Sequence, residues 1–367
     1  MKYFFIAGER SGDLHASNLI KELKRRDLEA EIVGFGGDMM EGEGLKLLRH
    51  YKDYSFMGLW EVIKNLGTIK TRLKECERAI KDFQPDVLVL VDFPGFNLRM
   101  AKFGKKLGIK TCYYISPKIW AWKKGRIKTI RKVVDKMLVI LPFEVRFFND
   151  LNFPVEYVGN PLMDSVRTFD FQPLEESNKT RIAVLPGSRL QELNSAIPVI
   201  KEMAEMKPEY QFLVAGVNNL PPKLYEELDR LKNVEVIFER TYDILKAANA
   251  AVVTSGTATL EACLLSAPQV VVYKTSWLTY KVGRAIINVD YLSLVNLIAD
   301  RPVIKELIQD DFNGKTVLEE VDRILTDPTY CANMLADYNE VKEKIGFEPA
   351  SKRAADALSN WLGIDSY

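Results

Sequence analysis

Short, continuous apolar runs alternate along the chain with segments whose apolar residues recur every three or four positions. Continuous runs of this kind are typical of strands that helices cover on both faces, as in a parallel sheet. The periodic segments between them predict amphipathic helices, so the chain consists of successive strand–helix–strand units. The predicted strands are 3–7, 31–37, 86–91, 110–115, 136–141, 181–186, 210–216, 250–255 and 269–273.

The two halves of the chain begin alike. Each opens with a strand, a short turn ("GERSGD" or "GSRLQE"), an amphipathic helix and a second strand. The segment between the halves, 161–180, has no clear period, and we interpret it as a linker. The sequence therefore predicts an α/β protein with two Rossmann-like, doubly wound domains, at 1–165 and 180–340, that face one cleft. The stretch 341–367 is expected to form a C-terminal helix that packs back on the first domain.

Composition and the opening residues narrow the class of protein. The 367 residues exceed what one hydrophobic core usually organises, which agrees with two domains. The cysteines are widely scattered, which argues against a disulfide framework and a structural zinc site and fits a reducing cytoplasm. The first strand runs directly into Glu9 and Arg10, unlike a signal peptide. No apolar run reaches the roughly 18 residues that a bilayer-spanning helix needs, although peripheral membrane contact remains open.

Charge is distributed unevenly between the halves. The whole chain carries a formal net charge of +1. Residues 1–160 contain 29 Lys and Arg against 20 Asp and Glu, a net of +9, whereas residues 161–367 contain 22 against 30, a net of −8. The first half is therefore the one suited to an anionic partner.

Two turns rich in small residues, "PGSRLQE" (186–192) and "TSGTATLEA" (254–262), each follow a predicted strand of the second half. Such a turn presents backbone N–H groups and the positive end of a helix dipole to an anion. Arg189 adds a planar cation suited to a diphosphate, and Glu261 is placed to accept hydrogen bonds from ribose hydroxyls. The hydroxyl side chains alternatively only cap helices, but two such turns in one domain favour a nucleotide site. The candidate residues are Gly187, Ser188, Arg189, Ser255, Gly256, Thr257 and Glu261.

Neither familiar nucleotide-binding fingerprint occurs in the sequence. There is no G-x-x-x-x-G-K-[ST], and no G-x-G-x-x-G after the opening strand, so ATP hydrolysis and hydride transfer have no support. There is also no D-x-D pair that would hold a metal ion on a diphosphate. We therefore expect neither a metal nor a cofactor, and protein groups have to neutralise the diphosphate.

An aspartate, Asp92, ends a very apolar predicted strand in "VDFPGFN" (91–97). Partial burial there raises the pKa of a carboxyl and makes it a better general base. On the residues alone, a turn former ahead of Pro94 is an equally good interpretation. The turn after the first strand, "AGERSGD" (7–13), adds polar groups at the same sheet edge, where Asp13 alternatively caps a helix. The candidate cleft residues are Gly8, Glu9, Ser11, Gly12 and Asn97.

Two segments combine apolar and basic residues. The first, 57–73, has apolar residues at helical spacing with interleaved Lys and Arg, which fits either a core-facing helix or an interfacial helix lying on a membrane. The second, "YYISPKIWAWKKGRIKTIRK" (113–132), places tryptophans beside a basic run, which suits nucleic acid, a membrane surface, a phosphorylated ligand or merely the solvated face of a helix. The candidate membrane contacts are Leu59, Trp60, Ile63 and Leu66.

Taken in order, these motifs resemble one family, the lipid-A-disaccharide synthases, which are glycosyltransferases of the GT-B architecture. The matching stretches are "AGERSGD", "MGLWEV", "PDVLVLVDFPGFN", "SPKIWAW", "LPFE", "YVGNP", "LPGSR", "TSGTATLE" and "LVNLIADR". They span nearly the whole chain, and the ordered set is far more specific than any single member.

The resemblance implies transfer of 2,3-diacylglucosamine from its UDP derivative to 2,3-diacylglucosamine 1-phosphate. The product is a β-1,6-linked disaccharide 1-phosphate, and UDP leaves. By this resemblance the first domain binds the acceptor, Asp92 deprotonates its 6-hydroxyl, and Ser116 and Trp120 lie near the cleft. The second domain binds UDP, with Arg189, the "TSGTATLE" helix and Asn296 stabilising the leaving group.

The chain departs from the family pattern at two positions. Gly95 stands where many relatives have a second acid, so no role can rest on a carboxylate there. Asn160 stands where relatives often have His, which puts a proton relay at that position in doubt.

Other functions are weighed against this one. The nearest alternatives are another GT-B UDP-N-acetylglucosamine transferase with a membrane lipid acceptor, and a UDP-N-acetylglucosamine 2-epimerase, which shares the two-domain plan but has no acceptor. Nucleic acid is a remote possibility, because no known RNA- or DNA-binding module is present. The expected partners are both diacylated sugars, the inner membrane surface as a peripheral contact, and a second copy of the chain in a homodimer. The expected location is the cytoplasm, at that membrane.

Overall fold

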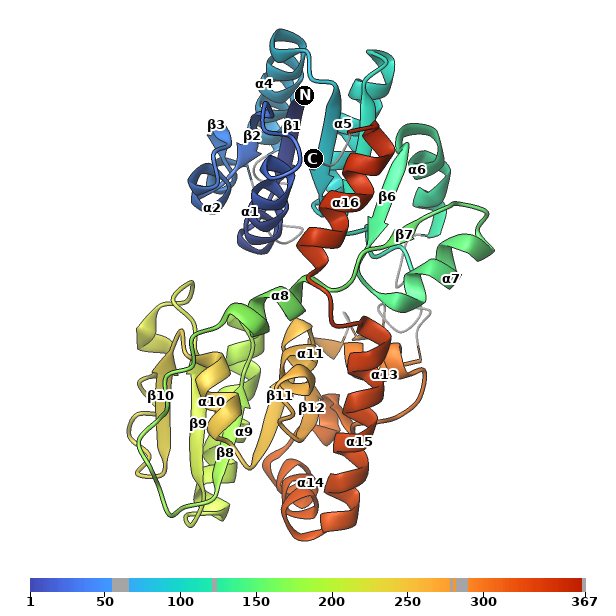
Figure 1. The fold of residues 1–367 in the computed structure, drawn as a ribbon. Helices are drawn as coiled ribbons and strands as arrows, with labels where there is room; N and C mark the ends of the chain where they lie inside the picture. The colour runs from blue at the N-terminus through green and yellow to red at the C-terminus, as the bar shows by residue number, and fades with distance from the viewer. Residues whose placement is uncertain (55–65, 121–123, 278–279, 282–289, 365–367) are drawn as a thin grey trace. The chain divides into compact units, whose positions relative to one another are not determined.

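The computed structural model describes residues 1–54, 66–120, 124–277, 280–281 and 290–364. The chain divides into two compact units. The first comprises Met1–Asp164 together with Phe347–Tyr367, and the second comprises Ser165–Gly346. Each unit is a parallel sheet with helices packed against it (Figure 1). The doubly wound α/β organisation predicted from the apolar runs is thus confirmed.

The first unit is built on a parallel sheet in the order β3-β2-β1-β4-β5-β6-β7. Its strands are β1 (Lys2–Ala7), β2 (Glu31–Gly36), β3 (Lys46–His50), β4 (Val87–Val91), β5 (Lys110–Tyr114), β6 (Lys136–Val139) and β7 (Glu156–Tyr157). Its helices are α1 (Arg10–Lys24), α2 (Asp38–Gly42), α4 (Leu66–Phe83), α5 (Pro94–Lys106), α6 (Ile127–Val133), α7 (Pro142–Asp150) and α16 (Ala350–Leu362).

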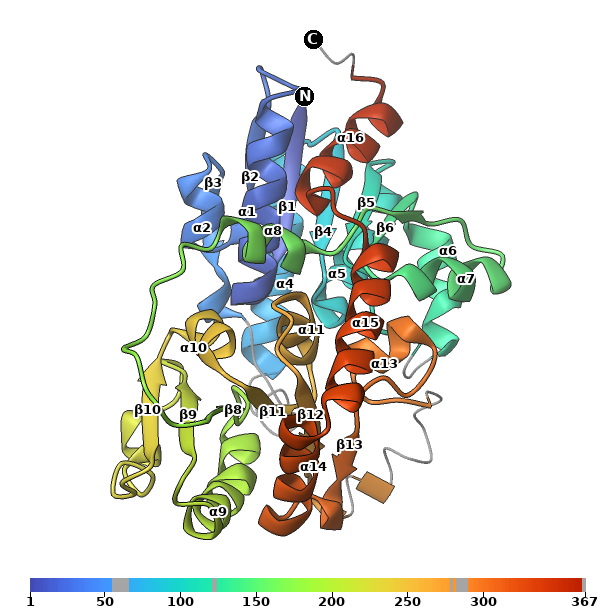
Figure 2. The same cartoon turned by 60° about the horizontal axis from the view of Figure 1, so that its bottom comes forward.

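Strand β1 shows how this sheet separates two cores. Phe4 and Ile6 point to the side covered by α4, α5 and α6, whereas Tyr3, Phe5 and Ala7 point to the side covered by α1 and α16. All five side chains are fully buried, which explains why the strand is apolar throughout. Helices α1 and α16 lie side by side, as Figures 1 and 2 show.

The second unit has a parallel sheet in the order β10-β9-β8-β11-β12-β13. Its strands are β8 (Arg181–Leu185), β9 (Gln211–Gly216), β10 (Val234–Phe238), β11 (Ala250–Thr254), β12 (Gln269–Tyr273) and β13 (Glu306–Ile308). Its helices are α9 (Leu190–Met206), α10 (Thr241–Ala247), α11 (Thr257–Leu264), α13 (Leu294–Ala299), α14 (Gly314–Thr326) and α15 (Pro328–Ile345).

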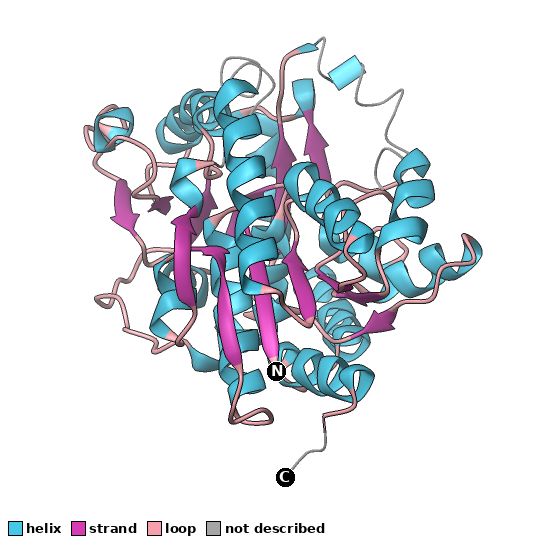
Figure 3. Ribbon diagram, turned by 90° about the horizontal axis from the view of Figure 1, so that it is seen from above, coloured by secondary structure: helices cyan, strands magenta, loops and turns pink. Residues whose placement is uncertain are grey.

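The second sheet is also covered on both faces. Residues such as Leu185, Leu213 and Val253 form a core with α10 and α11 on one face. The alternate residues of the same strands, among them Val184 and Val214, are also buried. Helices α9 and α14 lie side by side against the sheet. Figure 3 shows strands with helices on both sides of them.

Some boundaries differ from the sequence expectation. The segment 161–180, expected to be irregular, begins with helix α8 (Pro161–Thr168). Residues 341–345, expected in the C-terminal helix, instead end helix α15 of the second unit. Asp13 does act as a cap, but for α2 rather than α1, because its carboxylate accepts hydrogen bonds from the backbone N–H groups of Gly37, Met39 and Met40.

Candidate active site

Each sheet has one point at which the direction of the strand order reverses. In the first unit this point lies between the paired strands β1 and β4, and in the second between β8 and β11. Loops that follow such neighbouring strands diverge and leave a crevice, where ligands of doubly wound sheets bind. The candidate residues at 8–12, 92–97, 187–189 and 255–257 come directly after these four strands. The structure thus brings the predicted residues of each unit to one edge of its sheet.

Asp92 follows β4 in an unusual backbone conformation. Asp92 and Phe93 both have positive φ angles, 45° and 46°, which side-chain-bearing residues adopt only when the surroundings hold them there. The Asp92 carbonyl accepts hydrogen bonds from Asn97 Nδ2 at 2.8 Å and from Tyr113 Oη at 2.5 Å. Its N–H donates to the carbonyl of Tyr114 at 3.0 Å. Hydrogen bonds with Asn97, Tyr113 and Tyr114 therefore hold the backbone of the aspartate in place.

Gly8 is explained by its contact with the same loop. A Cβ atom at position 8 would lie 2.1 Å from Cγ of Phe93, far inside van der Waals contact. The ring of Phe93 stacks on Phe96 at a centroid distance of 5.8 Å and meets the edge of Tyr54. Gly8 thus leaves room for the ring that anchors the residue next to Asp92, which is a packing role.

The groups around the Asp92 carboxylate shift its pKa in opposite directions. Partial burial raises its pKa to about 6, and the carboxylate of Glu9 adds to the rise. The ammonium of Lys118 and the N–H of Phe93 act the other way. Ser11 Oγ donates a hydrogen bond to Glu9 Oε1 at 2.8 Å, which orients the second acid. A carboxyl with a pKa near 6 is largely ionised at neutral pH yet more basic than an exposed aspartate, as a general base requires.

Asn97, Ser116 and Trp120 were expected to line the cleft, but all three are buried. The Asn97 amide donates to backbone carbonyls, including those of Val91 and Asp92. Ser116 Oγ and Trp120 Nε1 both donate to the buried carboxylate of Glu144. These bonds hold the loops in place, and the Asn97 Oδ1 atom is buried without a hydrogen-bond partner among the described residues. Gly12 is likewise buried, inside the first turn of α1 against Ala7.

Glu144 is the residue that the sequence reasoning missed. The signals were its place in "LPFE", one of the stretches that resemble the family, and the order P-x-E directly after an apolar strand, and neither assigns the side chain a partner. Its partners at 116 and 120 are brought to it by the fold, so sequence spacing did not reveal them.

In the second unit, the turn 187–189 is already satisfied by its own helix. Glu192 Oε2 accepts hydrogen bonds from the N–H groups of Ser188 and Arg189, at 3.1 and 3.2 Å. Gly187 has φ +100°, and a Cβ there would lie 2.7 Å from Cβ of Glu192. The expectation of free N–H groups here is therefore not met, because the Glu192 carboxylate occupies them. The Arg189 side chain is 75% exposed, and its guanidinium pairs with Glu192 Oε1 at 3.4 Å.

The turn 255–257 is more open. No side chain of the described residues caps the first turn of α11, and a Cβ added to the exposed Gly256 would meet nothing within 4 Å. Ser255 Oγ donates to the carbonyl of Leu292 at 3.0 Å, which ties this turn to the start of α13. Glu261, one turn into α11, accepts a hydrogen bond from Tyr242 Oη at 2.7 Å, and burial raises its pKa. The uncapped N-terminus suits an anion.

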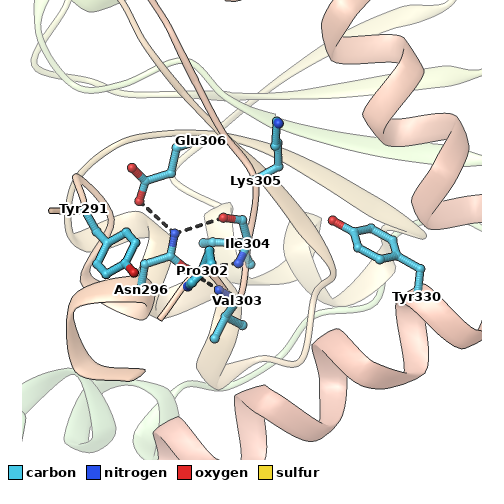
Figure 4. A pocket seen from close by; sticks show the side chains of 8 residues that line it. All are labelled: Tyr291, Asn296, Pro302, Val303, Ile304, Lys305, Glu306 and Tyr330. Carbon is cyan, nitrogen blue, oxygen red and sulfur yellow. Dashed lines mark hydrogen bonds between the residues drawn. The ribbon is translucent and has the colours of Figure 1, made fainter. Parts of the chain in front are cut away.

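Asn296 lines a cavity of about 250 Å³, together with Tyr291, Pro302, Val303, Ile304, Lys305, Glu306 and Tyr330 (Figure 4). Its amide nitrogen donates to the Ile304 carbonyl and to Glu306 Oε1, both at 2.9 Å. Its oxygen accepts from the N–H groups of Val303 and Ile304. Every donor and acceptor of this amide is used, so Asn296 shapes the loop before β13 and has no free group for UDP.

The candidate membrane contacts can be placed only in part. Leu59, Trp60 and Ile63 lie outside the described residues, and Leu66 is described only as the first residue of α4. Among the described helices, none combines the length and apolar character needed to cross a bilayer. The described part of the chain also holds no group of three His, Cys, Asp or Glu side chains arranged to bind a metal ion.

Comparison with known proteins identifies the family. The sequence pattern of the lipid-A-disaccharide synthetases matches residues 3–358. The chain belongs to the lipid-A-disaccharide synthetase family. Members of this family are hexosyltransferases that act on UDP-sugar donors and lipid acceptors. The chain is thus an enzyme of lipid A disaccharide synthesis.

Individual relatives of this synthetase family cover nearly the full chain. The chain is 36% identical to the lipid-A-disaccharide synthase of Geobacter sulfurreducens over 378 residues, which cover 99% of this chain and 97% of the relative. It is 38% identical to the enzyme of Syntrophus aciditrophicus, covering 95% of each. It is also 38% identical to that of Myxococcus xanthus, covering 97% of this chain and 96% of the relative.

Solved structures with the same fold include both expected types of enzyme. A UDP-GlcNAc 2-epimerase from Neisseria meningitidis bound to UDP-GlcNAc superposes with a TM-score of 0.71 at 15% identity, covering 98% of this chain and all of that chain. The calicheamicin glycosyltransferase CalG4 superposes with a TM-score of 0.64 at 16% identity, covering 99% and 98%. At these identities the similarity concerns the fold alone, and it confirms the GT-B architecture of this synthetase.

Proposed function

We propose that this enzyme transfers 2,3-diacylglucosamine from UDP-2,3-diacylglucosamine to O6 of 2,3-diacylglucosamine 1-phosphate. Asp92 accepts the proton of the acceptor 6-hydroxyl while O6 attacks the anomeric carbon. The bond from that carbon to the UDP oxygen breaks, and UDP departs with the electron pair. One displacement inverts the anomeric centre and gives the β-1,6-linked disaccharide 1-phosphate. The observation that carries this proposal is the half-buried Asp92 at the strand-order reversal of the first unit.

The same proposal assigns the donor to the second unit. Because Glu192 occupies the N–H groups of the turn 187–189, we assign the diphosphate to the exposed Arg189 guanidinium and the uncapped start of α11 at Gly256 and Thr257. Glu261 accepts hydrogen bonds from the ribose hydroxyls. Tyr242 Oη donates a hydrogen bond to the same carboxylate and thereby orients it. Fixed dipoles and a guanidinium stabilise charge that develops on the leaving UDP. Asn296 and Ser255 position this turn indirectly.

The experiment follows UDP and disaccharide from purified protein and both diacylated sugars. We expect equal amounts of the two products, and no UDP without the acceptor. UDP release that is independent of the acceptor, or epimerised UDP-sugar, would favour the 2-epimerase alternative and refute the transfer.

Asp92→Asn tests the base. We expect turnover to fall by about 10²–10⁴-fold, the usual contribution of a general base, with the UDP dissociation constant unchanged. Asp82→Asn is the matched control, because Asp82 is 71% exposed on α4 and should leave both quantities as in the wild type. Loss of UDP binding in Asp92→Asn would instead give Asp92 a structural role.

We also propose that the enzyme works on the cytoplasmic face of the inner membrane, where a diacylated acceptor resides. The support is the apolar–basic pattern of 57–73 and the +9 charge of residues 1–160. Replacing Leu59, Trp60 and Ile63 by Ser should release the protein from anionic vesicles while its circular dichroism stays unchanged. Loss of structure would show that the three side chains belong to the core. The homodimer stays a prediction, which sedimentation at equilibrium would test.

A further inference from the structure

Glu144 is a buried carboxylate with four hydrogen-bond donors around it. It lies in the first turn of α7 and is 2% exposed. Its Oε1 accepts from Ser116 Oγ and from Trp120 Nε1, the latter at 3.2 Å. Its Oε2 accepts from the N–H groups of Leu141 at 2.9 Å and Ile140 at 3.2 Å. All four donors are neutral, and this arrangement keeps the buried charge satisfied without a counter-ion.

The bonds of Glu144 connect the loops that follow two neighbouring strands, and a further bond reaches the loop after a third. Ser116 and Trp120 follow β5, and Ile140 and Leu141 follow β6. Asn160, which follows β7, donates to the Ile140 carbonyl at 3.2 Å and accepts from the Leu162 N–H at 3.0 Å. The Glu144 carboxylate thus joins the loops after β5 and β6, next to β4 and Asp92, and Asn160 ties the loop after β7 to the same backbone.

The loop 116–120 presents one side chain to solvent. Ser116, Pro117, Ile119 and Trp120 are buried, and Lys118 alone is exposed. The Trp120 ring meets Phe143 of α7 edge-on at 5.0 Å, so the loop is pinned at both ends to the same helix start. Strand β5 pairs with β4, and the carbonyl of Tyr114, two residues before Ser116, accepts the Asp92 N–H at 3.0 Å, so the loop begins next to Asp92. The Lys118 ammonium on this loop lowers the pKa of the Asp92 carboxyl. The geometry that holds this loop therefore decides where the ammonium lies.

We propose that Glu144 is a positioning residue, which fixes the loop 116–120 so that the Lys118 ammonium stays beside the catalytic Asp92 and the acceptor. The inference rests on the proposed function of Asp92. In this proposal Glu144 is buried and touches neither substrate. Ser116 and Trp120 are the residues through which it holds the loop. It also separates Lys118, which then belongs to the active site, from the other basic residues of the segment 118–132.

The charged groups that face Asp92 come from two elements. Glu9, at the start of α1, raises the pKa of Asp92, and Lys118, after β5, lowers it together with the Phe93 N–H. Near Glu144, Tyr157 of β7 has a pKa that burial raises, that Arg353 of α16 lowers and that the Glu144 carboxylate raises further. If the loop loosens, Lys118 moves away while Glu9 stays. The pKa of Asp92 then rises, and the base is lost at a higher pH than in the wild type.

The test compares Glu144→Gln with Glu156→Gln. The first puts an amide NH₂ where an acceptor oxygen met N–H donors, and the second alters an exposed glutamate of β7 that pairs with Lys136. For Glu144→Gln we expect the acceptor KM to rise by about ten- to a hundredfold, the size of a small misplacement at the reacting centre. We expect the UDP affinity to stay unchanged and the acid limb of the kcat/KM–pH profile to move to higher pH. Glu156→Gln should match the wild type in all three.

Lys118→Met separates positioning from mere stabilisation. It should shift the acid limb in the same direction, and in the Glu144→Gln background it should add no further shift, because the ammonium has already moved. An unchanged acid limb in Glu144→Gln, or additive shifts in the double variant, would overturn the proposal. If Glu144→Gln does not fold, Trp120→Phe takes its place, because it removes one donor and keeps the carboxylate. An unchanged acid limb in Trp120→Phe, or additive shifts with Lys118→Met, would then overturn the proposal. A wild-type enzyme that forms no disaccharide would refute the proposed function, whereas an active wild type with no shift refutes this inference alone.

Discussion

The conformation and the burial of Asp92 both lower the stability of the folded chain. It lies in a left-handed conformation beside a second such residue, and its carboxylate is partly removed from water with Glu9 nearby. Each of these features disfavours the native state, and they coincide at the strand end where the chemistry is proposed. A residue selected only for stability would not combine them.

The stability cost predicts a pH-dependent effect of Asp92→Asn. A carboxyl whose pKa is about 6 in the folded chain and lower when unfolded destabilises the fold fully above pH 6. This penalty fades as the pH falls towards the pKa of the unfolded chain, because both states then carry the proton. The neutral variant should therefore have the higher thermal midpoint at pH 8, and the two proteins should converge near pH 4. A lower midpoint for the variant at pH 8 would show that the carboxylate stabilises the fold.

The same group sets an expectation for the wild-type rate. Because the base works only when ionised, kcat/KM should fall about tenfold per pH unit below an apparent pKa near 6. A rate profile measured with both diacylated sugars between pH 4.5 and 8 checks this. A flat profile down to pH 4.5 would contradict Asp92 as the base.

At the scale of elements, the sequence predicted the central strands and missed the strands at the edges. Strands such as β4 and β11 are buried on both faces, so they appear as continuous apolar runs. The edge strands β3 and β10 are partly exposed, with patterns that do not differ clearly from loops. The short strands β7 and β13 carry too few residues for any period. The inner strands of a parallel sheet can be recognised in the sequence, because helices cover both of their faces and their residues are therefore apolar without interruption.

The candidate site was predicted well in position and less well in role. Residue types at strand ends revealed where the loops of Asp92, Arg189 and Gly256 lie, since strand ends follow from the apolar runs. The hydrogen-bond partners did not follow, because they come from residues far away in the sequence. Asn296 and Ser116, for example, satisfy buried groups of their own unit. Whether a polar side chain faces a ligand or another loop depends on this tertiary pairing.

The two glycine turns of the second unit should respond differently to an added methyl group. Gly187→Ala forces a side chain into φ +100° and against Glu192, so we expect a loss of about 1–3 kcal/mol of unfolding free energy. Gly256→Ala meets open space and should leave the unfolding free energy nearly unchanged, while weakening UDP binding if the diphosphate lies at the start of α11. Urea titrations and calorimetric UDP binding distinguish them. Unchanged UDP affinity in Gly256→Ala would remove this turn from the proposed site.

On the scale of the whole molecule, the chain returns to its first unit after completing the second. Helix α16 contributes Ala354, Ala355 and Leu358 to the core that also contains Leu19 and Ile20 of α1. Its start is fixed by Asp164, whose carboxylate accepts hydrogen bonds from the N–H groups of Ala350 at 2.8 Å and Ser351 at 3.0 Å. The first unit is therefore made from two separate stretches of sequence.

Removal of this cap should loosen the returning helix. For Asp164→Ala we expect a loss of about 1–2 kcal/mol, as for other helix caps, and faster amide hydrogen exchange in α16. Asp356→Ala is the control on the same helix, because Asp356 is 47% exposed and caps no helix start, and ion pairs with an exposed partner typically contribute at most about 1 kcal/mol. Equal exchange rates in the two variants would show that packing alone holds α16.

The returning helix also has a consequence for synthesis on the ribosome. Residues 165–346 are made before 347–367, so the second unit can complete its sheet while the first still lacks α16. Until then the nascent first unit presents the apolar side of α1, with Leu19 and Ile20, to solvent. Translation that stops early would leave that surface permanently open, and such surfaces are bound by chaperones or aggregate. Addition of the last helix thus completes the core of the first unit.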